Sequence, residues 1–406
     1  MQAASSGDTV RIDPGTYYES VRITQHSLVI RGSGPDTVIL PAEAGSSESG
    51  SAFWYEASGS GEHVISDLTV IGGTGTPMLA REACGGAIAW ACWTQGGALR
   101  LERCAFVTNT AMGWLGSGGA VFTSGLDRAE VENVVCDGNV AEAFGGGLHF
   151  TGVRSVRLDG LRLIGNDSPG RCEGNIMWYG DSRGAVEMTN CEVTSSPIAG
   201  SQVGTAVELH ANEIRVSRCS FVDLSVSGAA MRTVLGGVAM QEELRGPIRL
   251  LHSTWQASTP GVDGWNHYDV TILDDEGDLE VARCAFVGRR VYASVVNGPV
   301  TWMRNVMESG ALRHDSRVGG RIECSVFHET PVTRSNRGSW VLADTLVQDP
   351  LFCDVDANDL RVREGSPCVG GVCGQIGPFG VGCAQVPVHK VSWGMLKRQW
   401  EAARKK

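Results

Sequence analysis

Leu101-Glu102-Arg103-Cys104-Ala105-Phe106 is the stretch that decides the fold, because it returns along the chain. It recurs as Val216-Ser217-Arg218-Cys219-Ser220-Phe221 and as Val281-Ala282-Arg283-Cys284-Ala285-Phe286. Weaker copies start at Ile65, Val131, Leu158, Met188, Leu250, Trp302 and Ile322. Successive starts are separated by between 20 residues (Trp302 to Ile322) and 36 residues (Ile65 to Leu101). This range fits one coil of a solenoid whose turns vary in length.

A second pattern lies between the copies of the first. Glycine pairs precede short apolar runs at Ile88, Val121 and Leu148, and similar runs begin at Ile176, Val207 and Val238. Both patterns have the two-residue period of strands and lack helical periodicity. One coil cannot bury its own apolar face, whereas stacked coils bury a continuous column. We therefore predict an all-β, right-handed parallel β-helix solenoid of at least ten coils.

Two further stretches resemble a known superfamily. The opening Gly7-Asp8-Thr9-Val10, continued by Pro14-Gly15-Thr16-Tyr17, resembles the start of the pectate-lyase-like β-helices. The stretches from Asp349 to Cys353 and from Gly365 to Cys383 resemble the last coils of secreted bacterial β-helix proteins. The resemblance implies the fold and export. It leaves the reaction open, because the superfamily hosts lyases, hydrolases, esterases, epimerases and adhesins.

The domain plan follows from these boundaries. Residues 1–383 are expected to form the β-helix, with 349–383 as cysteine-rich terminal coils, and 384–406 a basic amphipathic tail. In the tail, Trp393, Leu396 and Trp400 recur at helical spacing, which predicts a short C-terminal helix. This helix would either cap the last coil or act as a sorting or anchoring tail in contact with an anionic membrane.

Charge is unevenly distributed. The net charge is −11, yet all four lysines (Lys390, Lys397, Lys405 and Lys406) lie in the last seventeen residues. With two arginines and one glutamate, that tail carries 6 − 1 = +5, which leaves −16 on residues 1–389. An acidic body argues against a nucleic-acid partner. No apolar run is long enough to span a bilayer.

Export is expected on two grounds. The opening from Gln2 to Val10 has the character of the interior of a longer chain, so we expect a missing N-terminal segment that included an export signal. The superfamily resemblance points in the same direction. We therefore expect a secreted or cell-surface protein.

The cysteines form two groups. Cys104, Cys191, Cys219 and Cys284 occupy one repeat position, where other coils carry Leu68, Val134, Leu161, Ser253 or Asn305. Since small or apolar residues replace them, we predict buried free thiols. The second group lies in the glycine-rich end, where the resemblance to exported proteins favours disulfides. Its members are Cys353, Cys368, Cys373 and Cys383.

Asparagines recur at matching turn positions. Asn109, Asn139 and Asn166 are expected to stack, with their amides hydrogen-bonded along the solenoid axis. Asparagine also tolerates left-handed turns.

Catalytic signatures of related folds are largely missing. The coil has no lysine, which closes the route of lyases that use a lysine base, although an arginine base remains open. Alternation along the glycine-preceded strands turns the neighbours of Val121, Leu148 and Val207 outward. The expected functional face therefore carries polar and ionisable residues on one sheet. They are His149, Tyr179, Asp181, Glu208, His210 and Gln241.

Within that face, Glu208, His210 and Asp181 are the candidates for acid and base roles. The turn Trp265-Asn266-His267-Tyr268-Asp269 would extend the binding surface, because Trp and Tyr stack on sugar rings. Asp354, Asp356 and Asn358 space oxygens like a calcium loop, although the usual glycine and glutamate are missing. Calcium is thus the single cofactor that the sequence suggests.

The expected function is recognition of a polysaccharide or another surface ligand through the sheet face. A polysaccharide lyase or glycoside hydrolase that uses Glu, Asp, His or Arg is the alternative. A non-catalytic adhesin or structural spacer is the second alternative.

Overall fold

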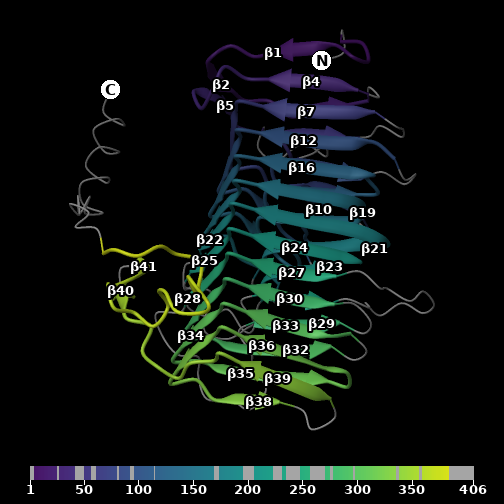
Figure 1. The fold of residues 1–406 in the computed structure, drawn as a ribbon. Helices are drawn as coiled ribbons and strands as arrows, with labels where there is room; N and C mark the ends of the chain where they lie inside the picture. Colours follow the sequence, from purple (N-terminus) through teal and green to yellow (C-terminus); the bar gives the residue numbers. More distant parts are fainter. Residues whose placement is uncertain are drawn as a thin grey trace.

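The chain winds into a long solenoid of parallel strands (Figure 1). The computed structural model describes residues 4–24, 27–41, 50–55, 61–79, 82–91, 96–113, 115–168, 173–194, 205–222, 231–234, 247–256, 270–274, 278–295, 298–334, 338–355 and 359–383. All regular elements within these ranges are strands. The predicted all-β parallel β-helix is therefore confirmed, while the expected helix in 384–406 lies outside the described residues.

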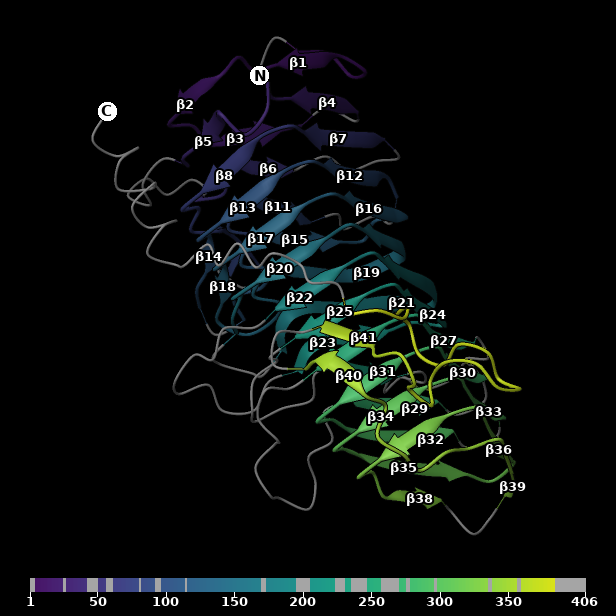
Figure 2. The same ribbon diagram turned by 60° about the vertical axis from the view of Figure 1, so that its left-hand side comes forward.

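Three ladders of parallel strands run along the solenoid, which Figure 2 shows from a second side. Sheet 1 contains the strands that follow the glycine-rich turns, such as β11, together with their counterparts in the other coils: β3 (Val21–Ile23), β6 (Phe53–Tyr55), β11 (Ile88–Ala91), β15 (Val121–Ser124), β19 (Leu148–Asp159), β21 (Glu173–Thr189), β23 (Thr205–His210), β26 (Met231–Val234), β29 (Val270–Asp274), β32 (Arg290–Val295), β35 (Ala311–Ser316) and β38 (Val332–Arg334). These twelve strands exceed the ten coils predicted.

The repeated motif crosses the other two sheets. Sheet 2 contains the second halves of β19 and β21 together with β1 (Thr9–Arg11), β4 (Leu28–Arg31), β7 (Glu62–Ser66), β12 (Ala98–Glu102), β16 (Arg128–Glu132), β24 (Glu213–Ser217), β27 (Ile248–Leu251), β30 (Leu279–Ala282), β33 (Val300–Met303), β36 (Gly319–Glu323) and β39 (Ser339–Ala343). Sheet 3 contains β2 (Gly15–Tyr17), β5 (Thr37–Ile39), β8 (Thr69–Ile71), β13 (Ala105–Val107), β17 (Val135–Asp137), β20 (Arg162–Ile164), β22 (Glu192–Thr194), β25 (Ser220–Val222), β28 (Thr254–Gln256), β31 (Ala285–Val287), β34 (Val306–Glu308) and β37 (Val326–His328).

Small pairs complete the strand list. They are the hairpin of β9 (Thr76–Leu79) and β10 (Glu82–Cys84), the parallel pair β14 (Thr110–Ala111) and β18 (Val140–Ala141), and the hairpin of β40 (Phe352–Asp354) and β41 (Asp359–Val362). Within the described ranges, no helix is long and apolar enough to cross a membrane.

Strand alternation builds the core as expected. In β12 the side chains of Leu99 and Leu101 are buried, whereas Arg100 between them points outward. Each coil continues such columns, so the inner side chains of successive coils form one hydrophobic cluster along the axis. Aromatic rings stack inside the coils of β25, β28 and β31, where Trp255 lies between Phe221 and Phe286 at centroid distances of 5.2 and 4.7 Å.

The asparagine prediction is confirmed. Asn139 donates from Nδ2 to Oδ1 of Asn166 at 2.7 Å, and Asn109 donates in the same way to Asn139 at 2.9 Å. Backbone N–H groups of Asn109 and Asn139 bond to the same amide oxygens. All three residues are at least 95% buried, so this ladder satisfies polar groups that would otherwise be stranded inside the turn.

The repeat-position cysteines are also placed as predicted. Cys104, Cys191, Cys219 and Cys284 are buried free thiols. Burial raises the pKa of Cys104 and of Cys284 to about 12, which keeps both thiols protonated and unreactive.

The C-terminal segment (residues 349–383) differs from the sequence-based expectation. It does not continue the solenoid as terminal coils but lies against the outer face of sheet 3 (Figure 2). Outward-facing Val287, Val306 and Val326 of that sheet pack with Phe352 and Ile376 of the segment. The physical reason is that these late sheet-3 strands carry valines on their outer face, and this apolar surface needs a cover.

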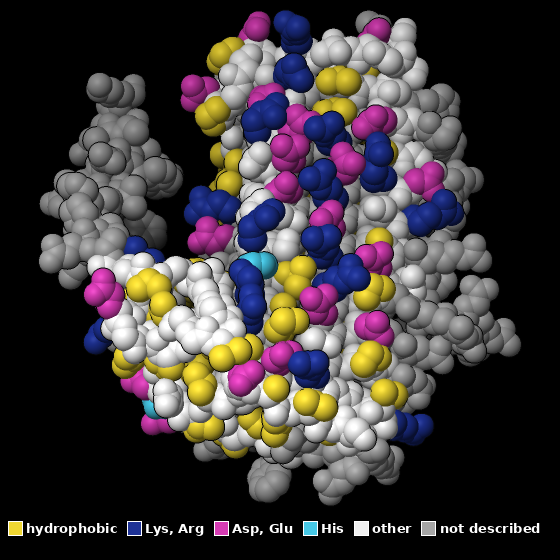
Figure 3. Space-filling view, viewed as in Figure 1, with side chains coloured by type: hydrophobic (Ala, Val, Ile, Leu, Met, Phe, Trp, Pro, Cys, Tyr) yellow, Lys and Arg dark blue, Asp and Glu magenta, His cyan; other side chains and the backbone are white. Residues whose placement is uncertain are grey.

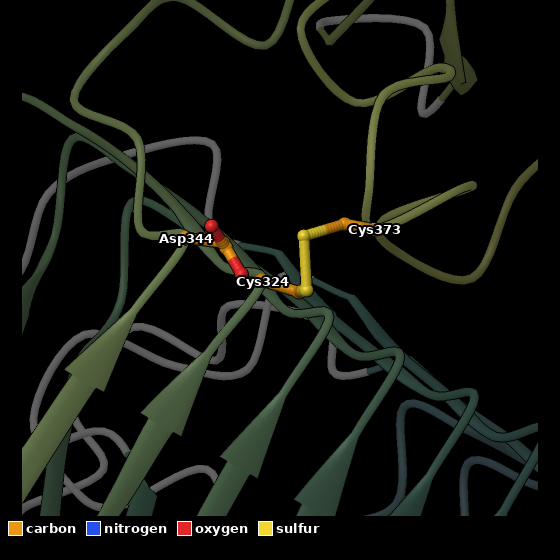
Figure 4. Close-up of side chains that lie close together, drawn as sticks. All are labelled: Cys324, Asp344 and Cys373. Atoms are coloured by element: carbon orange, nitrogen blue, oxygen red, sulfur yellow. A yellow bond between two sulfur atoms is a disulfide. The ribbon is translucent and has the colours of Figure 1, made fainter.

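Three of the four cysteines predicted to form disulfides do so, and the prediction is wrong for Cys368 alone. Cys353 pairs with Cys383 inside the C-terminal segment. Cys373, however, pairs with Cys324 of the coil, and Cys368 is a buried free thiol. Figure 4 shows that the Cys324–Cys373 bond joins coil and segment, with Asp344 of the next coil beside Cys324.

Candidate functional site

Strand register decides which of the expected site residues lie together on sheet 1. Tyr179 on β21 is opposite His210 on β23. Glu208 lies between Met177 of the preceding coil and Arg232 of the following coil. The backbone of Asp181 belongs to β21, but the side chains at these positions lie outside the described set.

The expectation for His149 is wrong. Its side chain is buried, with only 6% of its surface exposed to solvent. The imidazole ring packs against the rings of Phe122 and Phe144 at centroid distances of 5.3 and 5.7 Å. Phe144 comes from the connection before β19 and covers the outer side of the sheet here. Neither imidazole nitrogen has a hydrogen-bond partner, and burial lowers the pKa of His149 to about 3. This histidine is therefore a neutral part of an apolar cluster.

Other predicted ligand residues cannot be placed. Gln241, Trp265, His267, Tyr268 and Asp269 lie outside the described residues. Of the calcium candidates, Asp354 is exposed at the end of β40, and Asp356 and Asn358 are outside the described ranges. Nearby, Asp359 is engaged by Arg361, whose Nη2 lies 2.6 Å from its carboxylate.

Sheet 2 presents a charged outer face that is internally neutralised. Figure 3 shows Arg side chains alternating with Asp and Glu over this face. Arg100, for example, lies 2.5 Å from Glu102 and 3.8 Å from Glu130 of the next coil. Paired charges of this kind leave little field for an outside ligand.

The turn between sheets 2 and 3 is different. One residue per coil takes a left-handed conformation there, and in four successive coils it is basic: Arg218 (φ 53°), His252 (φ 49°), Arg283 (φ 53°) and Arg304 (φ 56°). We call these four residues the basic turn row. Coils are spaced about 4.8 Å apart, so the row is a straight line of regularly spaced cationic or ionisable groups.

No ion pair within the described part of the chain neutralises the row. Arg218 donates from Nε to the amide oxygen of Asn190 at 2.8 Å, which orients it without cancelling its charge. In an upper coil the equivalent Arg103 is neutralised by Asp67, through Nε–Oδ1 and Nη2–Oδ2 bonds of 2.6 and 2.9 Å. The row therefore carries uncompensated positive charge on a body that is otherwise acidic.

The C-terminal segment encloses a hollow beside two residues of the row, Arg218 and His252. A cavity of about 400 Å³ is lined by Arg218, Cys219, Ser220, His252, Thr254, Pro378 and Phe379. The segment is held in place because Gly377 donates its N–H to the carbonyl of Arg304 at 2.7 Å. Gly377 has φ +87°, and a Cβ there would meet Val306 at 3.0 Å, so glycine allows this close approach.

The hollow combines cationic and apolar groups. Burial, followed by the charges of Arg283 and Arg218, lowers the pKa of His252. Half-buried Phe379 offers an apolar surface opposite these groups. Such a site can hold an anionic group on the arginines and the apolar face of a ring against phenylalanine.

The sequence contained a signal for this row. The repeated motif carries arginine immediately before its cysteine in Arg218-Cys219 and Arg283-Cys284, and His252 and Arg304 occupy the same position. Sequence alone does not tell which of these basic residues are unpaired. The strand register is needed to show which coils place an acidic residue beside the turn.

Comparisons with known proteins show a similarity to a solved structure. No family model and no curated protein matches the sequence. Among solved structures, the chain is similar to the catalytic unit of a thermostable GH87 alpha-1,3-glucanase from Streptomyces thermodiastaticus strain HF3-3, with 12% identity and a TM-score of 0.43. The match covers 86% of this chain and 65% of the glucanase chain.

Proposed function

We propose that the protein binds an acidic polysaccharide along the basic turn row, with one sugar ring against Phe379. The observation that carries this proposal is the uncompensated charge of three arginines, with the ionisable His252 in the same row, beside a hollow with an aromatic wall. Carboxylate or sulfate groups are the natural partners of exposed arginines.

The geometry favours a polymer over a small anion. Three arginines and one histidine on four successive coils match a ligand that repeats its charge at every sugar or every second sugar.

A location outside the cytoplasm belongs to the same proposal. Two disulfides hold the C-terminal segment, and such bonds persist in oxidising compartments. We propose that the protein is secreted or displayed on the cell surface, where polysaccharides are accessible.

Catalysis on sheet 1 is the second candidate function. The register that sets His210 opposite Tyr179, and Glu208 beside Arg232, would supply an acid, a base and a cation from adjacent coils. With Asp181, these residues would suit a polysaccharide lyase or glycoside hydrolase. New reducing ends or unsaturated products that disappear in Glu208→Gln would establish this activity.

We expect the double variant Arg218→Gln/Arg283→Gln to bind polygalacturonate or alginate about tenfold more weakly or worse, because two charge-assisted contacts are lost. Isothermal titration at low and high salt measures the effect, and binding of the unaltered protein should weaken with salt. Arg154→Gln is the matched control, since Arg154 is equally exposed but pairs with Asp127 at 3.0 Å. Unchanged affinity in the double variant, or equal binding of neutral dextran, would contradict the proposal.

Binding should also depend on pH through His252. Its pKa lies below the ordinary value in the free protein, because of burial and then the neighbouring arginines. An anionic ligand stabilises the imidazolium form, so binding takes up a proton and affinity should rise as the pH falls from about 8 to about 5. In His252→Gln this rise should be absent. A variant that keeps the full pH dependence would assign the titration to another group.

A further inference from the structure

Three ligand-type side chains from separate parts of the chain converge at the junction of the coil and the C-terminal segment. They are Glu308 on β34, His328 on β37 and Asp349 at the start of the segment. One nitrogen or oxygen atom of each lies within 4.8 Å of the others. This cluster is separate from the basic turn row and from the calcium candidates around Asp354.

The coil itself sets up two of these side chains. Glu308 and His328 are register partners in adjacent strands of sheet 3, and both occupy outward positions beside the inward Met307 and Phe327. Asp349 is also oriented, because the N–H of Leu351 donates to its Oδ1 at 2.7 Å. Ser366 fixes the next residue by donating to the carbonyl of Pro350 at 2.6 Å.

Two atoms at the centre of the cluster lack the partners that burial requires. Oε2 of Glu308 and Nδ1 of His328 are inaccessible to solvent and accept no hydrogen bond. The closest approach recorded between the two side chains, 3.9 Å from Nδ1 to Oε1, is too long for one. A buried polar atom without a partner costs about 1–3 kcal/mol, more if charged, so two at one point indicate a missing ligand.

The charge balance indicates the sign of that ligand. Glu308 and Asp349 bring two carboxylates to this point, and the imidazole of His328 is the third group. Within the described residues, no arginine pairs with either carboxylate. A divalent cation would neutralise both carboxylates and give Nδ1 of His328 a partner.

We propose that Glu308, His328 and Asp349 form a binding site for a divalent transition metal of the zinc class, which clamps the C-terminal segment onto the coil. An imidazole nitrogen among the ligands disfavours calcium and magnesium, which prefer oxygen alone. At metal–ligand distances of about 2.0–2.2 Å, tetrahedral ligand atoms lie about 3.4 Å apart, so the side chains need to close by only about 1 Å. Three protein ligands leave a fourth position for water.

Cys368 is not counted among the ligands. It is a buried free thiol, and it does not belong to the group of side chains whose ligand atoms lie within 4.8 Å of one another.

The test is metal binding by the full chain in oxidising buffer, where the disulfides stay closed. We expect the purified, EDTA-treated and dialysed protein to bind one Zn²⁺ per chain by isothermal titration, and Zn²⁺ to raise its thermal midpoint. Ca²⁺ should do neither. Co²⁺ bound at the site should show visible absorption bands of a nitrogen and oxygen ligand set.

Variants separate this site from adventitious binding. His328→Gln and Asp349→Asn should each weaken Zn²⁺ binding about tenfold or more, since each removes one of three ligands. Asp349 is exposed, so its variant should fold normally even if His328→Gln does not. Glu329→Gln is the matched control: Glu329 lies nearby, exposed and bonded to Ser309, but outside the cluster.

Attachment of the C-terminal segment by the metal can be measured separately, as protection of this segment from proteases. Zn²⁺ should slow proteolytic cleavage within residues 349–383 in the unaltered protein and in Glu329→Gln, but not in Asp349→Asn. Absence of Zn²⁺ binding, or equal affinity in Asp349→Asn, would overturn the proposal. Neither outcome bears on polysaccharide binding, which uses different residues.

Discussion

Trp255→Ala should destabilise the lower coils by about 3–5 kcal/mol, the largest effect we expect from a single substitution. Trp255 is fully buried and its ring is nearly parallel to those of Phe221 and Phe286, at interplanar angles of 6° and 8°. Removing it leaves a cavity and breaks two aromatic contacts. Because each coil contacts only its neighbours, the loss should be local.

Hydrogen exchange measures this locality. The amides of β25, β28 and β31 should exchange faster in Trp255→Ala, whereas those of β13 and β17 should keep their protection. Trp54→Ala is the control, since Trp54 lies on the outer face of sheet 1 under Arg22 and is half-buried. Equal effects of the two substitutions would mean that the stacked column contributes little.

Trp255→Phe sharpens the interpretation. The indole Nε1 of Trp255 is buried without a hydrogen-bond partner, so phenylalanine removes an unsatisfied group while it keeps a ring in the stack. We therefore expect this variant to lose far less stability than alanine does.

The repeat was readable because a solenoid encodes its core locally. Every copy of the motif places an apolar side chain inside the coil on each strand and a polar residue in the turn. The same positions recur in the neighbouring coils. This is why the positions of Cys104 and Asn139 followed from sequence alone: both recur at a fixed place in the coil.

What covers the outside of the coil was not readable in the same way. Alternation shows that His149 points away from the axis, but whether Phe144 lies over it depends on the path of a connection. In sheet 3, outward residues change from charged Arg162 and Glu192 to apolar Val287 and Val306. That change was a signal for a covering segment, and the resemblance to terminal coils of other proteins obscured it.

Disulfide partners and the candidate site depend on this covering segment too. Cys373 meets Cys324 because residues 349–383 lie along sheet 3, a long-range contact that spacing does not encode. The hollow beside the basic turn row has the same origin, since Phe379 forms its wall from the far end of the chain.

Removing the Cys324–Cys373 bond should therefore release the C-terminal segment. The bond closes a loop across 49 residues, and chain entropy alone predicts a loss of about 4 kcal/mol for Cys324→Ala/Cys373→Ala. Outer-face Val287 and Val306 would then contact water intermittently. We expect faster proteolysis within 349–383 and a lower thermal midpoint for the segment, while the upper coils stay protected from exchange.

Cys353→Ala/Cys383→Ala is the matched control, because it removes a disulfide without removing the covalent link between the C-terminal segment and the coil. That bond spans 30 residues, so its entropy term is nearly the same, but both of its ends lie within the segment. It should lower the stability of the segment's own fold and leave the link at Cys324 intact. Polysaccharide affinity is the decisive comparison: it should fall in Cys324→Ala/Cys373→Ala, because Phe379 leaves the basic turn row. Affinity that survives this double variant but is lost in Arg218→Gln/Arg283→Gln would show that the row binds without the segment.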